Sequence, residues 1–225
     1  MSDDPRIGSE IAGYRVERMI GRGGMSVVYL AEQLRLGRKA ALKILAPELS
    51  QDQGFRERFV RESRLAASID HPNIIPIYDA GEAQGVLFIA MRYVDGIDLR
   101  QYLHEFGPLS PGKAVSVTAQ VASALDAAHA RGLVHRDVKP GNVLMASGTD
   151  AETSDHIYLA DFGLTKHALS VSGMTATGQF VGTIDYVSPE QIRGDPVDGR
   201  TDVYSLGCLL FECLTGEPRS RATKR

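Results

Sequence analysis

A short glycine-rich stretch at residues 21–26 (Gly-Arg-Gly-Gly-Met-Ser) lies between two segments that resemble β-strands. Glycines let backbone N–H groups approach phosphate oxygens closely, because no side chain intervenes. A dinucleotide-binding turn would be followed by a helix, whereas residues 27–30 favour a strand, and no Gly-Lys-Ser/Thr follows as in a Walker A loop. The stretch is therefore either a phosphate-binding turn within a hairpin or an ordinary hairpin turn.

Two charged side chains fall at positions that the apolar pattern marks as buried. Lys43 lies within residues 39–45, which otherwise form an apolar strand pattern, and Glu62 lies on the apolar stripe of a helix predicted over residues 55–69. A buried lysine needs an anion and a buried carboxylate needs a cation. We expect the two to pair, with a phosphate completing the site. The alternative is that Glu62 extends to solvent at the rim and that Lys43 is a surface lysine.

The densest motif is His-Arg-Asp-Val-Lys-Pro-Gly-Asn at residues 135–142, which follows a helix stop at Gly132. Asp-Phe-Gly follows at 161–163, Gly-Thr-x-x-Tyr-x-Ser-Pro-Glu at 182–190, and Asp-Val-Tyr-Ser-Leu-Gly at 202–207. Each motif is weak evidence alone, but the order and spacing are specific. Together they resemble the catalytic domain of the bacterial Hanks-type (eukaryotic-like) serine/threonine protein kinases, over about residues 14–218.

The resemblance implies roles in phosphoryl transfer from ATP. Asp137 would accept or orient the hydroxyl proton of a protein substrate, and Lys139 would offset charge on the transferring phosphate. Asn142 and Asp161 would hold two Mg²⁺ (or Mn²⁺) ions against the phosphates.

The resemblance also implies a nucleotide site. Backbone groups of the glycine-rich stretch would surround the phosphates, and Lys43, oriented by Glu62, would hold the α- and β-phosphates. Apolar side chains and strand backbone would enclose the adenine, with Met91 as gatekeeper. The residues implied in nucleotide binding are Gly21, Arg22, Gly23, Gly24, Met25, Ser26, Val28, Ala41, Lys43, Met91, Arg92, Val94 and Leu144.

The segment after the Asp-Phe-Gly motif resembles an activation segment. Thr175 and Thr177 stand where related bacterial kinases carry activating phosphothreonines, so the resemblance implies autophosphorylation at one or both. A cation at Arg136 calls for an anion from this segment. The residues expected to have structural roles are His135, Arg136, Phe162, Gly163, Thr183, Glu190 and Asp202.

The candidate site residues have to be positioned by strands and helices. The first part of the chain is mostly strand pattern with one helix, and the rest is mostly helical pattern, with a short helix near 99–104 and a long one near 110–131. The predicted fold class is α+β, a protein-kinase-like two-lobe fold with a small antiparallel β-sheet lobe, one main helix in that lobe, and a mostly helical lobe that lacks its last helices. The predicted parts are a flexible lead-in (1–12), an N-lobe (13–93), a C-lobe (94–218) and a basic tail (219–225).

Composition limits the partners and the compartment. The chain has 25 Lys and Arg against 28 Asp and Glu, a net charge of −3, which argues against binding nucleic acid or membrane through bulk positive charge. Two cysteines and an acidic start without an apolar run predict a cytoplasmic chain with no membrane segment, or one attached to a membrane through something else. The resemblance implies protein substrates and a possible homodimer through the N-lobe.

Two features depart from the family pattern. Ser26 replaces the third glycine of the phosphate turn, which puts little in doubt. Residues 203–214 carry one charge, Glu212, and are apolar on nearly every face, so we expect this helix to be buried all round. Because few residues follow it, the helices that cover it in the family are expected to be missing, which would leave an apolar surface open and leave Glu190 without its arginine partner.

Three functions follow from these observations. The first is an ATP- and Mg²⁺-dependent protein serine/threonine kinase regulated by activation-segment autophosphorylation. The second is a catalytically weak, truncated kinase-like module that binds nucleotide or a partner. The third, an aminoglycoside-type small-molecule kinase, is disfavoured by the Ser-Pro-Glu and Asp-Phe-Gly segments with a phosphorylatable loop between them.

Overall fold

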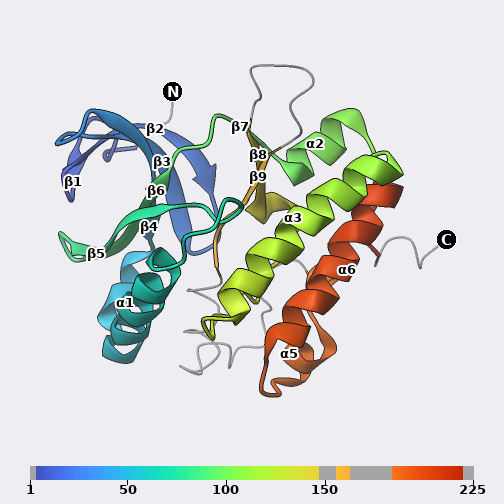
Figure 1. Cartoon of the computed structure of the whole chain (residues 1–225). Coiled ribbons are helices and arrows are strands. Elements are labelled where there is room, and N and C mark those ends of the chain that lie inside the picture. Colours follow the sequence, from blue (N-terminus) through green and yellow to red (C-terminus); the bar gives the residue numbers. More distant parts are fainter. Residues whose placement is uncertain (1–3, 147–155, 163–183, 220–225) are drawn as a thin grey trace. The chain divides into compact units, whose positions relative to one another are not determined.

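The computed structural model of this 225-residue chain describes residues 4–146, 156–162 and 184–219 (Figure 1). The chain divides into two compact units. Met1–Ser68 and Pro76–Val94 form the first, here called the sheet unit, and Ile69–Ile75 and Asp95–Arg225 form the second, the helical unit. The division after Val94 lies next to the predicted boundary between residues 93 and 94. Nothing in the sequence indicates that residues 69–75 belong to the helical unit.

The sheet unit is built on a six-stranded sheet in the order β1-β2-β3-β4-β6-β5, in which every neighbouring pair is antiparallel. Its strands alternate buried and exposed side chains where one face meets the core, as in β2, where Tyr14 and Val16 are buried and Arg15 is exposed. The strands are β1 (Glu10–Ile11), β2 (Tyr14–Arg22), β3 (Ser26–Gln33), β4 (Arg38–Leu45), β5 (Ile77–Ala83) and β6 (Val86–Arg92).

One α-helix belongs to the sheet unit. The turn η1 (Pro47–Gln51) leads into α1 (Gln53–Ala67), and the Asp52 side chain caps the helix by accepting the Phe55 N–H at 2.8 Å. Phe55 and Phe59 are fully buried and stack with ring centroids 6.4 Å apart. The helix ends at Ala67, two residues before the predicted end, because the backbone N–H of Ser68 closes the last turn on Arg64 and Leu65.

The flexible lead-in predicted over residues 1–12 is wrong for its described residues, 4–12. The Tyr29 hydroxyl donates to Asp4 Oδ2 at 2.6 Å, and the Gly8 N–H donates to the Val16 carbonyl at 2.8 Å. Ile11, on the two-residue strand β1, is buried in the sheet core. A strand this short has no detectable alternation, and the buried Tyr29 hydroxyl that needs a partner lies far along the sequence.

The helical unit combines helices with a small sheet in the order β7-β8-β9. α3 and α6 pack against each other, and α2 packs on the turn η2 (Figure 1). The elements are β7 (Gly96–Asp98), α2 (Leu99–Phe106), α3 (Pro111–His129), η2 (Pro140–Asn142), β8 (Val143–Ala146), β9 (Ile157–Leu159), η3 (Ile184–Tyr186), α5 (Pro189–Arg193) and α6 (Gly199–Thr215).

The segment Ile69–Ile75 joins this unit through polar contacts. The Ile75 N–H donates to the Leu159 carbonyl at 3.0 Å, and the Leu159 N–H donates to the Asn73 carbonyl at 2.7 Å. The buried Asn73 amide also donates to Gln120 Oε1 at 2.9 Å and to the Ile157 carbonyl at 3.0 Å. The segment thus pairs with β9 and contacts α3, which fixes one border of the strand that leads to Asp161.

The helix over residues 203–214 is buried on one side only, and part of its apolar surface is open, as the sequence leads us to expect when the covering helices are missing. Cys208, Leu209 and Cys213 are buried, but Val203 is 63% exposed and Leu214 is 44% exposed. Glu212, the single charge of the segment, is buried and accepts a hydrogen bond from the Tyr186 hydroxyl. The helix therefore buries one side, and its charge lies on that side because the tyrosine supplies a donor.

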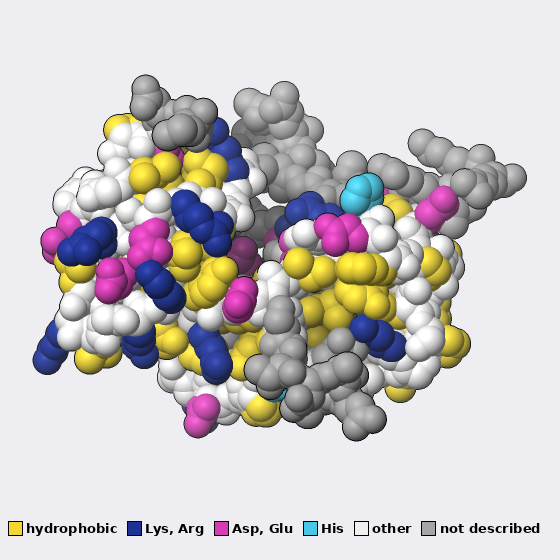
Figure 2. Space-filling view, turned by 90° about the horizontal axis from the view of Figure 1, so that it is seen from above, with side chains coloured by type: hydrophobic (Ala, Val, Ile, Leu, Met, Phe, Trp, Pro, Cys, Tyr) yellow, Lys and Arg dark blue, Asp and Glu magenta, His cyan; other side chains and the backbone are white. Residues whose placement is uncertain are grey.

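Charges of both signs are mixed on the face that Figure 2 draws. Figure 2 shows Lys and Arg side chains interspersed with Asp and Glu on one face of the molecule. In the sheet unit several form ion pairs, such as Lys39 on β4 with Glu17 on β2, and Arg56 with Glu82 at 2.5 Å. Among the described residues, no helix combines the length and apolar character needed to cross a bilayer.

Candidate active site

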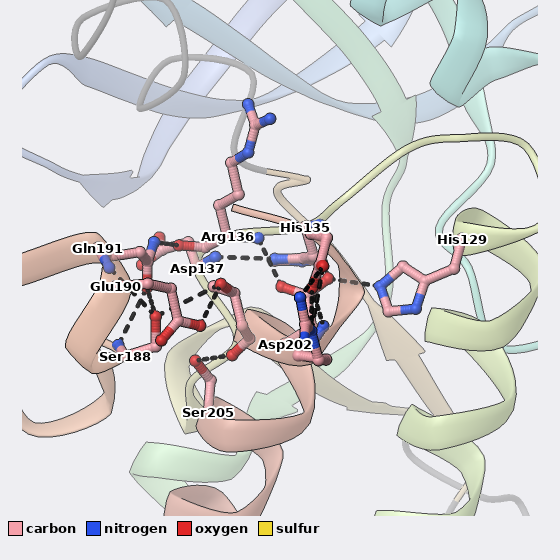
Figure 3. Close-up of polar contacts among 12 residues, drawn as sticks. His129, His135, Arg136, Asp137, Ser188, Glu190, Gln191, Asp202 and Ser205 are labelled. Carbon is pink, nitrogen blue, oxygen red and sulfur yellow. Dashed lines mark hydrogen bonds and ion pairs between the residues drawn. The ribbon is translucent and has the colours of Figure 1, made fainter. Parts of the chain in front are cut away.

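Asp202 holds the loop that follows α3. It lies in the first turn of α6 and is fully buried. Its carboxylate accepts the backbone N–H groups of His135 at 2.8 Å and Arg136 at 2.7 Å, and its Oδ2 lies 2.7 Å from Nε2 of His129 (Figure 3). A buried carboxylate is stable only when its lone pairs are used. These contacts therefore pin the start of the 135–142 loop to α3 and α6.

His135 lies beneath the loop and is fully buried. Its Nε2 lies 3.0 Å from the Ala160 carbonyl, and its Nδ1 accepts the Asp137 N–H at 3.3 Å. These two contacts require a proton on Nε2 and a lone pair on Nδ1, the neutral form of the ring. Burial lowers the pKa of His135, against the opposing charges of Asp202 and Asp137. The ring also packs on Phe162, with centroids 4.7 Å apart.

Asp137, Lys139 and Asn142 converge at the end of this loop. Lys139 Nζ donates to Asp137 Oδ2 at 2.7 Å. The Asn142 amide donates to the Asp137 carbonyl at 2.7 Å and to its Oδ2 at 3.2 Å. The Asp137 side chain keeps 16% of its surface exposed. The loop therefore presents a fixed carboxylate, with a cation beside it, that a solvent-borne group can reach.

Asp161 is brought to the same loop by strand pairing. β8 and β9 pair antiparallel with Val143 opposite Leu159, and the Ala160 N–H then donates to the Asn142 carbonyl at 2.9 Å. Asp161 is the next residue, so its backbone lies beside Asn142. Its charge is close enough to act on the His135 ring, as that of Asp137 does.

Two backbone outliers mark this region. Four non-glycine residues in the described part of the chain have a positive φ, and Arg136 (φ 64°) and Asp161 (φ 60°) are two of them. The other two, Ala12 and Gln84, lie in tight turns between paired strands. A left-handed conformation costs a non-glycine residue about 1–2 kcal/mol. Such strain, held here by hydrogen bonds on both sides of Arg136, is typical of functional sites.

The side chains of Asn142 and Asp161 suit a hard divalent cation. Magnesium prefers oxygen ligands and is commonly held by one or two protein groups together with substrate phosphates. The Asn142 nitrogen is engaged as a donor, so its Oδ1 is the atom that could coordinate. Within residues 4–146, 156–162 and 184–219, no group of three or more His, Cys, Asp or Glu side chains forms a metal cage. The donor set fits a cation shared with phosphates.

Comparisons with known proteins identify the family. The profile described as "Protein kinase domain" matches residues 14–225. The chain belongs to the protein kinase family. Serine/threonine-protein kinase PknD of Mycobacterium tuberculosis H37Rv is 48% identical over 223 residues, which cover 99% of this chain and 32% of PknD. PknB of M. tuberculosis H37Ra is 47% identical over 211 residues, 91% of this chain and 33% of PknB. This kinase chain thus spans about a third of the length of the curated relatives it matches.

Solved structures agree with this kinase fold. The kinase domain of M. tuberculosis PknI has a TM-score of 0.76 at 40% identity, with 94% of this chain and 78% of that chain covered. Rad53 1–466 in complex with AMP-PNP has a TM-score of 0.74 at 26% identity, covering 92% of this chain and 49% of that chain. The predicted resemblance to bacterial Hanks-type kinases and the predicted α+β kinase fold are confirmed.

The glycine-rich stretch of the kinase chain lies in a hairpin between β2 and β3. The Gly23 N–H donates to the Ser26 carbonyl at 2.8 Å, and Gly21 pairs with Val28 after a register shift. A strand follows, as the sequence predicts, and not the helix of a dinucleotide-binding turn. The contribution of Arg22, Gly24 and Met25 to phosphate binding stays a prediction.

One face of the kinase sheet gathers several predicted nucleotide residues. Lys43 is the cross-strand partner of Val28, and Ala41 is the partner of Met91. Cross-strand partners, and residues two apart on one strand, lie on the same face of a sheet. Val28, Ala41, Lys43 and Met91 therefore share a face. Lys43 and Glu62 are both half-buried, and their pairing remains a prediction.

The other predicted residues are placed as follows. Arg92 ends β6, and Val94 follows it at the end of the sheet unit. Leu144 lies on β8 of the helical unit. Gly163, Thr175, Thr177 and Thr183 lie outside the described residues.

Three residues that support the 135–142 loop or the start of α5 are missing from the sequence prediction: His129, Gln191 and Thr201. Gln191 donates to the Arg136 carbonyl at 3.0 Å and belongs to a capping box with Ser188 at the start of α5 (Figure 3). Thr201 donates to Glu190 Oε1 at 2.7 Å, which contributes most to a lowered pKa of Glu190. The Ser-Pro-Glu-Gln sequence is a capping-box signal that could have revealed Gln191.

Proposed function

We propose that this chain is the catalytic part of a protein kinase that transfers the γ-phosphoryl group of ATP to serine and threonine hydroxyls of proteins. One observation carries the proposal. The Asp137 carboxylate is fixed by Lys139 and Asn142 and stays partly exposed, so a substrate hydroxyl can reach it. The names of the relatives, serine/threonine-protein kinases, support the same function.

Asp137 is suited to receive the hydroxyl proton. An ionised carboxylate accepts a hydrogen bond from an incoming hydroxyl and orients its oxygen, a role that contributes about 10²- to 10⁴-fold in rate. Lys139 lies 2.7 Å from the same carboxylate, so its ammonium group is placed to offset negative charge near the attacking oxygen. Asp202 accepts the backbone N–H groups of His135 and Arg136, which helps to keep the loop and its Asp137 carboxylate in place.

Nucleotide and metal supply the remaining chemistry. ATP provides the phosphoryl group, and Mg²⁺ or Mn²⁺ neutralises charge on its phosphates. Asn142 Oδ1 and the Asp161 carboxylate are the oxygens of this chain that would hold the cations. Lys43, with Glu62, would bind the α- and β-phosphates, and Val28, Ala41 and Met91 offer an apolar face for the adenine.

Transfer of ³²P from [γ-³²P]ATP tests the function. The wild-type chain should label itself and a generic basic protein on serine or threonine in the presence of Mg²⁺. Asp161→Asn removes a metal-binding oxygen and its charge, so labelling should fall by at least about 100-fold. Asp126→Asn, an exposed carboxylate on α3, is the matched control and should behave as wild type. Wild-type labelling at background, while nucleotide still raises the melting temperature, would instead establish a non-catalytic nucleotide-binding module.

Phosphorylation of Thr175 and Thr177 is our proposed regulatory step. A phosphothreonine carries up to two negative charges and pairs readily with arginine. A chain with both threonines changed to alanine should lose the phosphates that mass spectrometry finds in this segment, and its activity should fall several-fold. Unchanged activity in the double variant would refute the regulatory role.

We also infer that the chain works in the cytoplasm, where ATP is available, and that it pairs through the sheet unit. Leu36 is 62% exposed in the turn between β3 and β4, next to exposed Leu34. Analytical ultracentrifugation should show a monomer–dimer equilibrium that Leu36→Asp shifts toward monomer. An identical equilibrium in the variant would remove this turn from the interface.

A further inference from the structure

Arg100 lies beside the candidate active site, and no hydrogen bond to it is found within the described part of the chain. It is the second residue of α2 and its side chain is exposed. Among the residues that the structure describes, no carboxylate or carbonyl accepts a hydrogen bond or forms an ion pair with its guanidinium group. Helix stability does not account for it, because the first turn of a helix favours acidic side chains over cations.

The guanidinium group packs on the loop that carries Asp137. A Cβ built on Gly141 would lie 3.6 Å from Cζ, 3.7 Å from Nε and 3.7 Å from Nη2 of Arg100. Because these distances are nearly equal, the planar group lies flat over Gly141. Flat stacking leaves the in-plane N–H groups directed outward, where they can form a two-pronged contact with a carboxylate. Gly141 lies in η2, the turn that ends at Asn142.

Arg100 is also near Tyr186, which ends η3. Burial and the Glu212 carboxylate raise the pKa of Tyr186, and the charge of Arg100 acts in the opposite direction. The guanidinium group therefore lies close to both the 135–142 loop and the segment that leads into α5. A peptide substrate whose hydroxyl reaches Asp137 also contacts residues that flank the 135–142 loop, and Arg100 is one of these residues.

The nearby acidic groups are occupied. Glu212 is buried and accepts the Tyr186 hydroxyl, and Asp137 accepts from Lys139. Asp185 is half-buried and has a polar interaction of its own. Unlike these three acidic residues, Arg100 is exposed and has no ion-pair partner among the described residues, so it can bind an anionic group from solution.

We propose that Arg100 is a specificity-determining residue that binds an aspartate or glutamate of the protein substrate close to the phosphorylated serine or threonine. The proposal rests on the proposed kinase function and narrows its substrate class to hydroxyls with acidic neighbours. The backbone path from Gly141 to Asp137 is at most about 15 Å, which corresponds to about four residues of an extended peptide.

A set of peptides tests the proposal. Each contains one threonine in a neutral sequence of glycine, alanine and glutamine, and an aspartate is placed at each flanking position in turn. Wild type should phosphorylate one or two of these peptides with a kcat/KM roughly three- to ten-fold above that of the neutral parent. Arg100→Gln should lose this preference and keep its rate on the parent. Arg100→Glu should prefer the peptide with arginine at the same position. Arg131 is an exposed arginine that follows the C-terminal end of α3, and Arg131→Gln should behave as wild type.

Each outcome decides the proposal. Wild type that phosphorylates the parent but shows no acidic preference overturns it and leaves the kinase function intact. An equal loss on every peptide in Arg100→Gln also overturns it, because this would show a structural role for Arg100. Reversal of the charge preference in Arg100→Glu cannot come from a folding defect. No transfer to any peptide, or to the chain itself, would contradict the kinase function and the proposal together.

Discussion

His135 shows how a single buried side chain positions the backbone of the loop that carries Asp137. Its Nδ1 accepts the Asp137 N–H and its Nε2 faces the Ala160 carbonyl, so one ring connects the loop of Asp137 to the strand end before Asp161. Protonation of Nδ1 would remove the acceptor and place a charge in an apolar environment. The ring is therefore a link between two motifs that lie far apart in the sequence.

Folding stability should depend on pH through His135. Its folded pKa lies below the ordinary value of 6.5. Between those two values the unfolded chain binds a proton that the folded chain does not, so the free energy of unfolding should decrease as the pH falls below 6.5, by at most about 1.4 kcal/mol per pH unit. Well above pH 6.5, His135 is neutral in both states and does not make the free energy of unfolding depend on pH.

Urea unfolding of wild type and His135→Phe between pH 5 and 8 measures this contribution. The variant should be less stable at pH 8 by about 1–3 kcal/mol, because it leaves the Ala160 carbonyl and the Asp137 N–H unpaired. Its stability should change less than that of wild type as the pH falls below 6.5. His104→Phe, which removes an exposed histidine, is the control. Equal slopes in wild type and His135→Phe would contradict the account.

At the scale of residues, the sequence predicted which residues form the candidate site better than it predicted which residues they contact. Asp137, Lys139, Asn142 and Asp161 followed from short motifs in a fixed order, and the first three meet in the structure. The bond between His129 and Asp202 joins residues 73 positions apart, and no local pattern encodes it. The stacking of Arg100 on Gly141 was missed for the same reason.

At the scale of elements, α6 supports the 135–142 loop. Its first turn presents the buried Asp202 carboxylate to the loop, and its Ser205 hydroxyl donates to the Tyr186 carbonyl at 2.7 Å. One helix thus holds the backbone before Asp137 and the backbone that precedes α5. A helix placed in this way has to remain fixed for the loop to keep its geometry.

Asp202→Asn should weaken this support. An amide offers one acceptor oxygen where the carboxylate offers two, so at least one donor of His129, His135 or Arg136 would face an NH₂ group. We expect a loss of about 2–4 kcal/mol in the free energy of unfolding. Hydrogen exchange should become faster at the His135 and Arg136 amides, and the exposed Asp126→Asn should leave both unchanged. Unaltered exchange at these two amides would show that the carboxylate does not hold the loop.

Elements with regular patterns were predicted well from the sequence. The strands of the sheet unit and the long helix that ends before Gly132 lie close to their expected positions, because alternation, helical periodicity and the helix stop are local signals. The failures have physical reasons. The lead-in folds because Asp4 satisfies a buried tyrosine of a distant strand. Which side of α6 is buried could not be predicted, because its apolar composition does not reveal which side meets α3.

At the scale of the whole molecule, the predicted site residues are divided between two compact units. The sheet unit carries Lys43, Glu62 and the glycine-rich turn, and the helical unit carries Asp137, Asn142 and Asp161. The order of motifs along the sequence was enough to predict the kinase family. It could not show that residues 69–75 belong to the helical unit, because that assignment depends on hydrogen bonds with β9 and α3.

The most direct test of the central claim is the rate of a single turnover with MgATP and a threonine peptide bound at saturation. This rate separates the chemical step from nucleotide binding. We expect Asp137→Asn to bind MgATP within about threefold of wild type and to transfer phosphate about 10³-fold more slowly, because the amide cannot accept the hydroxyl proton. Transfer by Asp137→Asn at the wild-type rate would contradict the assignment of this carboxylate and the function built on it.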